Sequence, residues 1–382
     1  MTMKTAPTYV TNRGAAYCGD SLRLLEELPD ESVNLVLTSP PFALQREKEY
    51  GNKAQSEYVE WLAQFARLVQ RKLRPDGSFV LDLGGAYESG APTRSLYNFR
   101  VAIHFCDVLG FFLAEDFYWH NPSKLPSPIE WVNKRKLRAK DSVNTVWWFG
   151  KTRWPKADVT KVLTEYSDRM KKLLENPEAF YTPKKRPSGH DIGKAFSKDN
   201  GGAIPSNLLQ ISNSESNGCY LRGCKAVGVK GHPARFPAKL PEFFIRLLTE
   251  PGDLVLDIFA GSNTAGAVAE QEGRRWIAFD ERLDYLAASA FRFFPEAATD
   301  TDLHAAHDAV LAGKPLDLRR TIFTEKNGAQ KMMDAHTPSM ETQGLLILAE
   351  TPKQELRCRK SFPISKGSEP FSVEDVKRVG AD

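Results

Sequence analysis

The chain has 382 residues, of which 41% are hydrophobic and 26% are charged, and its formal net charge is +4. These proportions are typical of a globular protein. No apolar run approaches the ~18 residues that span a bilayer, and the first residues lack the apolar core of a signal peptide. We therefore expect a cytoplasmic protein without a membrane partner. The mildly basic charge permits nucleic-acid binding without demonstrating it.

The five cysteines are scattered along the chain. Cys219 and Cys224 lie close together, but they have no second pair and no histidine at metal-ligand spacing. We interpret them as reduced thiols, and the sequence predicts no metal site.

Residues 15–150 alternate between strand-like and helix-like patterns. The apolar run Val33–Leu37 stops at Ser39-Pro-Pro41, which indicates a buried strand that ends in a rigid turn. Apolar residues recur at helical spacing from Glu57 to Leu73, and Phe79–Leu83 follows as a second strand after Pro75-Asp-Gly77. Strand, helix and strand in this order form a βαβ unit, which predicts a mostly parallel sheet.

Residues 151–230 differ in character, because they are rich in Pro, Gly and Ser, carry a basic excess and show no sustained periodicity. A disordered linker is one interpretation of this composition. Apolar residues such as Ile204, Leu208 and Ile211 favour the other interpretation, a small loop-rich insert domain.

Residues 231–310 return to an α/β pattern, and residues 311–382 form a polar tail of unknown role. In the α/β part, helices and strands are predicted in alternation at Pro241–Glu250, Asp253–Phe259, Thr264–Glu272 and Trp276–Phe279. The tail contains one isolated apolar run, Leu345–Leu348.

A Gly-rich loop, Asp257-Ile-Phe-Ala-Gly-Ser-Asn-Thr-Ala-Gly266, lies between a predicted strand and a predicted helix. Open α/β sheets bind ligands at this position, where Gly261 permits close approach and the helix start offers free N–H donors. The next strand ends at Asp280, and an acidic residue about 20 positions beyond such a loop can bind a ribose diol. A dinucleotide is a rival ligand, although Asn263 replaces the second glycine of its fingerprint. An ordinary strand–helix turn is a third interpretation.

The turn Ser39-Pro40-Pro41-Phe42 also follows a predicted strand. Its prolines remove two N–H donors, so a serine hydroxyl and carbonyl oxygens remain to accept hydrogen bonds. Such a turn suits the –NH2 group of a base, which is a poor nucleophile until its hydrogens are held and its lone pair is oriented. Phe42 can stack on the base, which must first leave the duplex. A plain Pro-Pro turn is the alternative.

The two motifs together, with the acceptor turn first and the Gly-rich loop later, resemble the β-class DNA amino-methyltransferases. Longer stretches are similar to a cytosine-N4-specific member of this class, among them TSPPFALQREKEYGN (38–52), NPSKLPSPIEWVNKRK (121–136), VNTVWWF (143–149), SKDNGG (197–202), NLLQISNSESNG (207–218) and HPARFPAKLPEFFIR (232–246). The resemblance implies a Rossmann-like class I methyltransferase with a mixed seven-stranded sheet flanked by helices. Its motif order is circularly permuted, so that the catalytic half (15–150) precedes the S-adenosylmethionine-binding half (231–310), and residues 151–230 form a target-recognition domain.

The resemblance assigns roles to individual residues. Ser39, Pro40, Pro41 and Phe42 match the catalytic turn. The residues that match cofactor-binding positions are Asp20, Phe236, Pro237, Asp257, Phe259, Ala260, Gly261, Ser262, Asn263, Thr264 and Asp280. Among these, Asp20 is expected to accept from the adenine amino group and Asp280 to hold the ribose. Asp20 and Asp280 can equally cap helices.

The function implied by the resemblance is methyl transfer from S-adenosylmethionine to N4 of a flipped-out cytosine in a palindromic duplex target, CAGCTG. Such an enzyme protects host DNA against a cognate restriction endonuclease that acts independently. In a DNA enzyme, some members of a basic cluster are expected to contact phosphates: Lys184, Lys185, Arg186, His190, Lys194 and Lys198.

Three alternatives remain open. An adenine-N6 methyltransferase usually has Asp in place of Ser39, so the serine favours cytosine N4. Two intact motifs disfavour a DNA-binding module without catalysis. The resemblance of the insert to a DNA-reading domain disfavours an RNA or protein methyltransferase. A cytosine-C5 enzyme is rejected, because it needs a Pro-Cys nucleophile and the sequence contains no Pro-Cys pair.

Overall fold

The computed structural model describes residues 3–43, 54–177, 198–214 and 218–319. These residues belong to one compact unit. Within them, no helix is both long enough and apolar enough to cross a membrane.

A ten-stranded sheet runs through the described part of the chain, in the order β10-β1-β2-β9-β8-β3-β4-β6-β5-β7. Its strands are β1 (Tyr9–Val10), β2 (Gly14–Cys18), β3 (Val33–Thr38), β4 (Leu73–Gly84), β5 (Phe112–His120), β6 (Val143–Gly150), β7 (Leu208–Gln210), β8 (Leu254–Asp257), β9 (Arg275–Asp280) and β10 (Leu316–Asp317).

The central part of this sheet is the mixed seven-stranded sheet that the resemblance implies. Strands β2, β9, β8, β3 and β4 are parallel, and β6 and β5 follow as antiparallel partners. The two- or three-residue strands β10, β1 and β7 extend its edges. Because five central strands are parallel, their carboxyl ends meet at one edge of the sheet, where ligands bind in open α/β folds.

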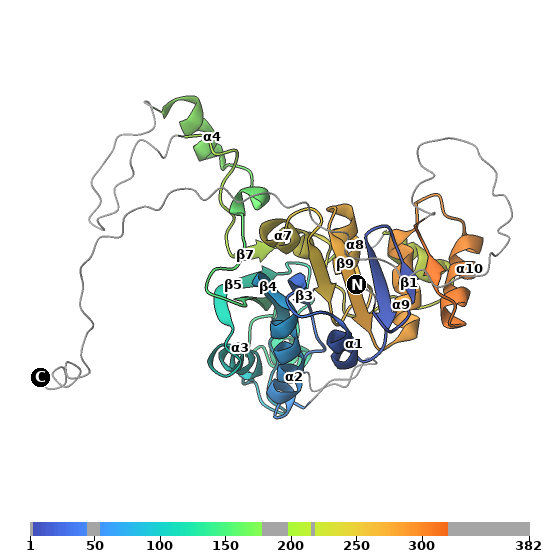
Figure 1. The fold of residues 1–382 in the computed structure, drawn as a ribbon. Coiled ribbons are helices and arrows are strands. Elements are labelled where there is room, and N and C mark those ends of the chain that lie inside the picture. Colours follow the sequence, from blue (N-terminus) through green and yellow to red (C-terminus); the bar gives the residue numbers. More distant parts are fainter. Residues whose placement is uncertain (1–2, 44–53, 178–197, 215–217, 320–382) are drawn as a thin grey trace, which may run out of the picture. The chain divides into compact units, whose positions relative to one another are not determined.

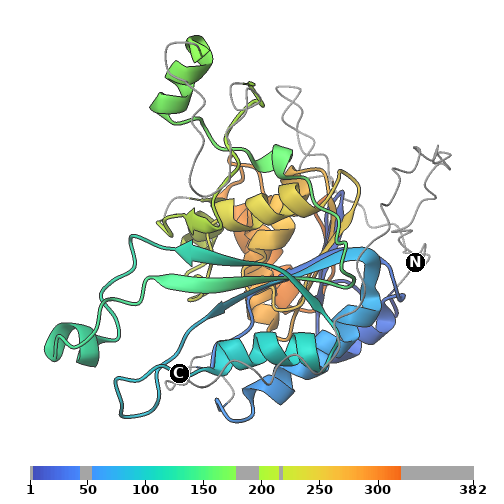
Figure 2. The same cartoon turned by 90° about the vertical axis from the view of Figure 1, so that its left-hand side faces the viewer.

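Helices lie on both faces of the sheet, while α4 stands away from it (Figure 1). The helices are α1 (Ser21–Glu27), α2 (Tyr58–Lys72), α3 (Tyr97–Asp107), α4 (Asp168–Glu175), α6 (Cys219–Ala226), α7 (Lys239–Leu248), α8 (Thr264–Gln271), α9 (Leu283–Ser289) and α10 (Asp300–Leu311), with short helical turns η1 (Glu130–Lys134), η2 (Val159–Val162) and η4 (Ala290–Phe293). In Figure 2 the blue and turquoise helices α2 and α3 lie on one side of the strands, and the yellow helix α7 lies on the other. Buried side chains of the sheet, such as Leu35 and Val80, belong to the same hydrophobic core as Phe244 and Ile245 of α7.

The elements predicted from periodicity are confirmed, with small differences at most of their ends. The exception is β4, which begins at Leu73, directly after α2, instead of at Phe79. Its pairing with β3 shifts between Val33↔Leu73 and Leu35↔Ser78, so Pro75-Asp-Gly77 lies in an irregularity of the strand. Proline, which has no N–H for the ladder, is tolerated at such a position.

Several elements were not predicted from the sequence, among them helices α3, α9 and α10. A local signal for α10 exists, because Thr299 and Asp302 form a capping box at its start. The other two helices carry no such side-chain cap.

The described parts of the insert contain η2, α4, β7 and α6, and β7 extends the sheet beside β5. Helix α6 packs closely against η4, since a Cβ placed on Gly223 would meet the Phe291 ring at 2.5 Å. Of the predicted basic cluster, all members except Lys198 lie outside the described residues. The start of the predicted tail belongs to the fold, because β10 pairs with the N-terminal strand β1 (Figure 1), whereas the apolar run Leu345–Leu348 lies outside the described residues.

Candidate active site

A cavity of about 410 Å³ opens at the carboxyl ends of β3, β8 and β9. This volume is in the range of small-molecule sites. Its lining comes from the Ser-Pro-Pro-Phe turn, the Gly-rich loop, α2, the segment before α7, the start of α1, and the end of β9 with the start of α9. It consists of Ser21, Ser39, Pro40, Pro41, Phe42, Trp61, Phe65, His232, Ala234, Arg235, Phe236, Ile258, Phe259, Ala260, Gly261, Ser262, Thr264, Asp280, Glu281, Arg282 and Tyr285. The structure thus brings the two sequence motifs to one cavity.

The Ser39 hydroxyl is oriented by a buried carboxylate. Its Oγ donates to Oδ2 of Asp82 over 3.0 Å, and Nδ2 of Asn144 donates to Oδ1 of the same group over 3.2 Å. Burial raises the pKa of Asp82 to about 6, while the two hydrogen bonds act in the opposite direction. At neutral pH Asp82 is therefore ionised and accepts a hydrogen bond from the Ser39 hydroxyl, so the Ser39 lone pairs remain available to accept from a ligand.

Two further contacts hold the turn. The buried Tyr58 hydroxyl donates to the Pro41 carbonyl over 2.8 Å. The Phe42 ring packs over Gly84 at the end of β4, where a Cβ would come within 2.5 Å of the ring. Glycine at this position therefore leaves room for an aromatic ring beside the Ser39 hydroxyl.

The Gly-rich loop is fastened to Asp280 at the end of β9. The backbone N–H of Gly261 donates to Asp280 Oδ2 over 2.7 Å, and that of Arg282 donates to Oδ1 over 2.9 Å. Burial raises the pKa of Asp280 to about 6 despite these bonds. Gly261 has a φ of +50°, and a Cβ there would lie 3.0 Å from the His232 ring. A side chain at residue 261 would thus be strained and crowded.

Asp257 lies behind the Gly-rich loop and connects this loop to the end of β3 through hydrogen bonds. Its Oδ1 accepts from Thr38 Oγ1 over 2.6 Å and from the Phe259 N–H over 3.1 Å. It is 2% exposed, and burial raises its pKa to about 7. Thr38 immediately precedes Ser39, so this contact fixes the spacing between the Ser-Pro-Pro-Phe turn and the Gly-rich loop.

Four predicted cofactor residues do not line the cavity. Asp20 is the N-cap of α1 and accepts from the Leu22 N–H over 2.9 Å. Asn263 is fully buried, caps α8 and donates to the Tyr9 hydroxyl. Asp257 lies behind the loop, and the Pro237 carbonyl accepts from the Leu240 N–H at the start of α7. The neighbours Ser21 and Phe236 line the cavity instead.

Several site residues were missed by sequence reasoning. Trp61 and Phe65 appeared only as the apolar face of a helix, yet their rings lie 5.7 and 4.9 Å from that of Phe259. His232 packs edge-on against Tyr285 at 4.5 Å, and burial lowers its pKa to about 4. Asp82 carried one usable signal, because an acidic residue in an otherwise apolar strand is unusual.

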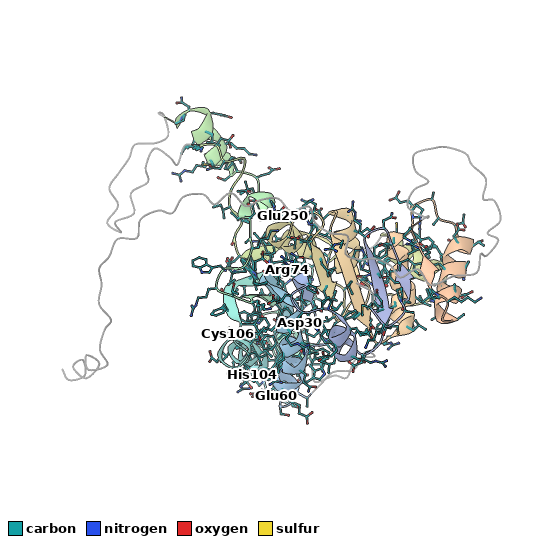
Figure 3. The ribbon with its side chains drawn as sticks, viewed as in Figure 1. Asp30, Glu60, Arg74, His104, Cys106 and Glu250 are labelled. Atoms are coloured by element: carbon teal, nitrogen blue, oxygen red, sulfur yellow. The ribbon has the colours of Figure 1, made fainter. Side chains whose placement is uncertain are left out.

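His104 lies on α3, outside the cavity lining. Its Nε2 is 3.8 Å from Oε1 of Glu60 on α2. Figure 3 labels both residues, which lie near each other on the two helices. Within the described ranges, no group of three or more His, Cys, Asp or Glu side chains is arranged to hold a metal ion.

Comparisons with known proteins agree with this geometry. Residues 33–291 match the model of a family described as DNA methylase, which comprises N6 and N4 methyltransferases. The type II methyltransferase M.PvuII of Proteus hauseri is 67% identical over 316 residues, which are 83% of this chain and 94% of that protein. M.ScaI of Streptomyces caespitosus is 26% identical, over 76% of this chain and 84% of that protein.

A solved structure of the cytosine-N4-specific PvuII DNA methyltransferase matches this fold with a TM-score of 0.69 and 57% sequence identity, over 83% of this chain and 99% of that one. The family match spans the strands that carry both motifs, and the PvuII match extends over nearly the whole relative. The chain belongs to the N6/N4 DNA methylase family.

Proposed function

We propose that this protein transfers a methyl group from S-adenosylmethionine to the exocyclic N4 amine of a cytosine in duplex DNA. The observation that carries the proposal is the Ser39 hydroxyl, which is bound to the buried Asp82 at the wall of the cavity formed with the Gly-rich loop. The 67% identity to M.PvuII and the cytosine-N4 specificity of the matching solved structure support the choice of base.

The catalytic turn can hold the amine by its two hydrogens. Ser39 Oγ directs its own proton to Asp82 and accepts one amine hydrogen. We assign the other to the Pro40 carbonyl, because the Pro41 carbonyl accepts from Tyr58. With both hydrogens held, the nitrogen becomes pyramidal and its lone pair is oriented toward the methyl donor. Once methylated, the nitrogen is acidic and releases a proton to Ser39 Oγ, which passes its own to Asp82.

The cavity fits S-adenosylmethionine by the chemistry of its wall. Asp280 offers a carboxylate for ribose hydroxyls, and Gly261 leaves the loop without a side chain at the point of closest approach. The rings of Trp61, Phe65 and Phe259 present aromatic surface, which favours a nearby cation. When bound, S-adenosylmethionine supplies a methyl group on a positively charged sulfur.

The target base must leave the duplex to reach this cavity, because its amine is inaccessible within the stack. We assign target reading to the insert, residues 151–230, and expect the palindrome CAGCTG from the resemblance. A cognate restriction endonuclease that acts independently of this protein would complete the modification system. Adenine N6 is the second candidate, since the family model includes both activities.

Nucleoside mass spectrometry of DNA modified by the purified protein tests the proposal. We expect N4-methylcytosine as the main product, and resistance of CAGCTG sites to a nuclease blocked by that modification. A digest that contains only N6-methyladenine would overturn the cytosine assignment and retain amino-methylation. Absence of any methylated base would overturn both.

A further inference from the structure

The loop between β5 and β6, residues 121–142, has no role in the reaction described above, yet it rises from the edge of the sheet that carries Ser39. Strand pairing places Val143 opposite His120, and Asn144 opposite Gly84 at the end of β4. Figure 2 shows this loop extending beyond the strand ends with η1 within it. Asn144, two residues after the loop, holds the carboxylate that binds Ser39.

The loop is strongly basic and keeps a defined shape. It contains six Lys and Arg residues and two acidic residues, Glu130 and Asp141. Lys140 Nζ donates to the carbonyls of Pro122 and Lys124 over 3.0 and 3.2 Å, which joins its two limbs. Asp141 also pairs with Arg94 at 2.9 Å, outside the loop. The charge suits a polyanion, and the internal bonds mean that ordering the loop on binding costs little entropy.

Large apolar side chains project from this basic loop. Leu125 is 80% exposed, Ile129 61% and Leu137 52%. Leu125 is the most exposed of the three. It follows Lys124, whose charge is close enough to lower the pKa of Asp82. An exposed leucine among cations at the rim of a catalytic site indicates a surface that becomes buried on binding.

We propose that Leu125 is a wedge that enters the duplex and occupies the space left by the target cytosine when that base turns into the cavity. The inference rests on the proposed function. Apolar side chains inserted between base steps stabilise unstacked DNA, and flanking cations bind its phosphates. Leu125 is therefore a positioning residue, which acts on the flipped state of the DNA and not on the methyl transfer itself.

The test compares two duplexes that are identical except at the base opposite the target cytosine, which is guanine in one and an abasic site in the other. Single-turnover methyl transfer is measured with the full-length protein. For Leu125→Ala we expect a rate about tenfold lower on the paired duplex, because base opening is then unassisted, and less than about threefold lower on the abasic duplex, where little opening is needed. Leu125→Met should retain the wild-type rate on both.

Leu113→Ala is the matched control, since Leu113 is also exposed and lies at the other end of β5. Its rates should equal those of the wild type. An equal loss for Leu125→Ala on both duplexes overturns the wedge, and so does no loss on either duplex. If the equal loss is accompanied by a changed oligomeric state in light scattering, Leu125 belongs instead to a contact between copies of this chain. If the wild-type protein methylates neither duplex, the proposed function itself fails.

Discussion

Among the single residues of the site, Ser39 and Asp82 depend on each other, because the Ser39 hydroxyl donates a hydrogen bond to the Asp82 carboxylate. Their hydrogen bond of 3.0 Å assigns the serine proton to a carboxylate whose pKa is raised to about 6 by burial. Because the Ser39 proton is directed to Asp82, the Ser39 lone pairs are left to accept, as the proposed grip on an amine requires.

Replacing Ser39 by Ala removes the acceptor and leaves the fold intact. We expect turnover to fall roughly 10²-fold or more, as for other well-placed polar groups in a transition state, with S-adenosylmethionine and DNA binding retained. Single-turnover kinetics and equilibrium binding measure the two effects. Ser39→Thr, which keeps the hydroxyl, is the control. A variant that loses DNA binding and turnover together would contradict the assignment.

Asp280 is predicted to bind the ribose of the cofactor. Asp280→Ala should weaken S-adenosylmethionine binding by about 1–3 kcal/mol, the scale for losing a charged hydrogen-bond acceptor. Asp76→Ala, at an exposed carboxylate near the opposite edge of the sheet, should bind normally. Calorimetry on folded variants measures both, and unchanged affinity for Asp280→Ala would remove Asp280 from the site.

At the scale of elements, the start of α8 depends on one strained residue. Asn263 has a φ of 51° and caps the helix by accepting from the Gly266 N–H over 3.1 Å. Asparagine tolerates this left-handed conformation better than most residues, and glycine tolerates it without cost. This explains why an asparagine can occupy a position where the dinucleotide fingerprint has glycine.

Asn263→Ala should therefore lower the free energy of unfolding more than Asn263→Gly does. Both variants lose the cap and the bond to Tyr9, so the difference between them, about 1 kcal/mol, isolates the backbone strain of a non-glycine residue. Urea denaturation of the two variants gives the comparison. Equal stabilities would show that the loop relaxes away from this conformation.

The end of β8 gives a pH-dependent stability. Burial raises the pKa of Asp257 to about 7 in the folded protein, above its ordinary value of 3.8. Ionisation of Asp257 at higher pH therefore destabilises the folded state. This destabilisation is relieved progressively as the pH falls through about 7 toward 3.8. Both hydrogen bonds are accepted by Oδ1, which an asparagine retains. In thermal melts, Asp257→Asn should thus gain stability relative to the wild type at pH 8 and keep only a smaller part of that advantage at pH 5, which lies between the folded and the ordinary pKa of Asp257. A gain that is the same at both pH values would contradict the buried ionisation.

At the scale of the whole molecule, a net charge of +4 is modest for a protein that binds DNA. The loop at residues 121–142 alone contributes six cations against two acids, so positive charge is concentrated beside the catalytic edge of the sheet. Such an uneven distribution attracts phosphates more effectively than the net charge suggests.

Neutralising Lys184, Lys185 and Arg186 in the insert should weaken binding to every DNA sequence. The slope of log Kd against log salt should flatten by about one unit for each phosphate that the variant no longer binds. Neutralising Arg13, Lys314 and Arg319, which are exposed beside the short edge strands β1 and β10, should leave the slope unchanged. If the insert variant keeps the wild-type slope, its cations face solvent.

The order of strands and helices around both motifs follows from the amino-acid sequence, because it depends on periodicity and turn residues within short windows. The family follows from the sequence too, through the Ser-Pro-Pro-Phe turn and the Gly-rich loop. Which side chains support the two motifs depends instead on how the sheet is assembled. Asp82 faces Ser39 because β3 and β4 pair with Thr38 opposite Leu81, and Asp257 reaches Thr38 across 219 residues of chain. Registers and long-range contacts of this kind arise from packing of the whole sheet, so no local pattern could distinguish Asp280, which lines the cavity, from Asp20, which caps α1 and lies outside the lining.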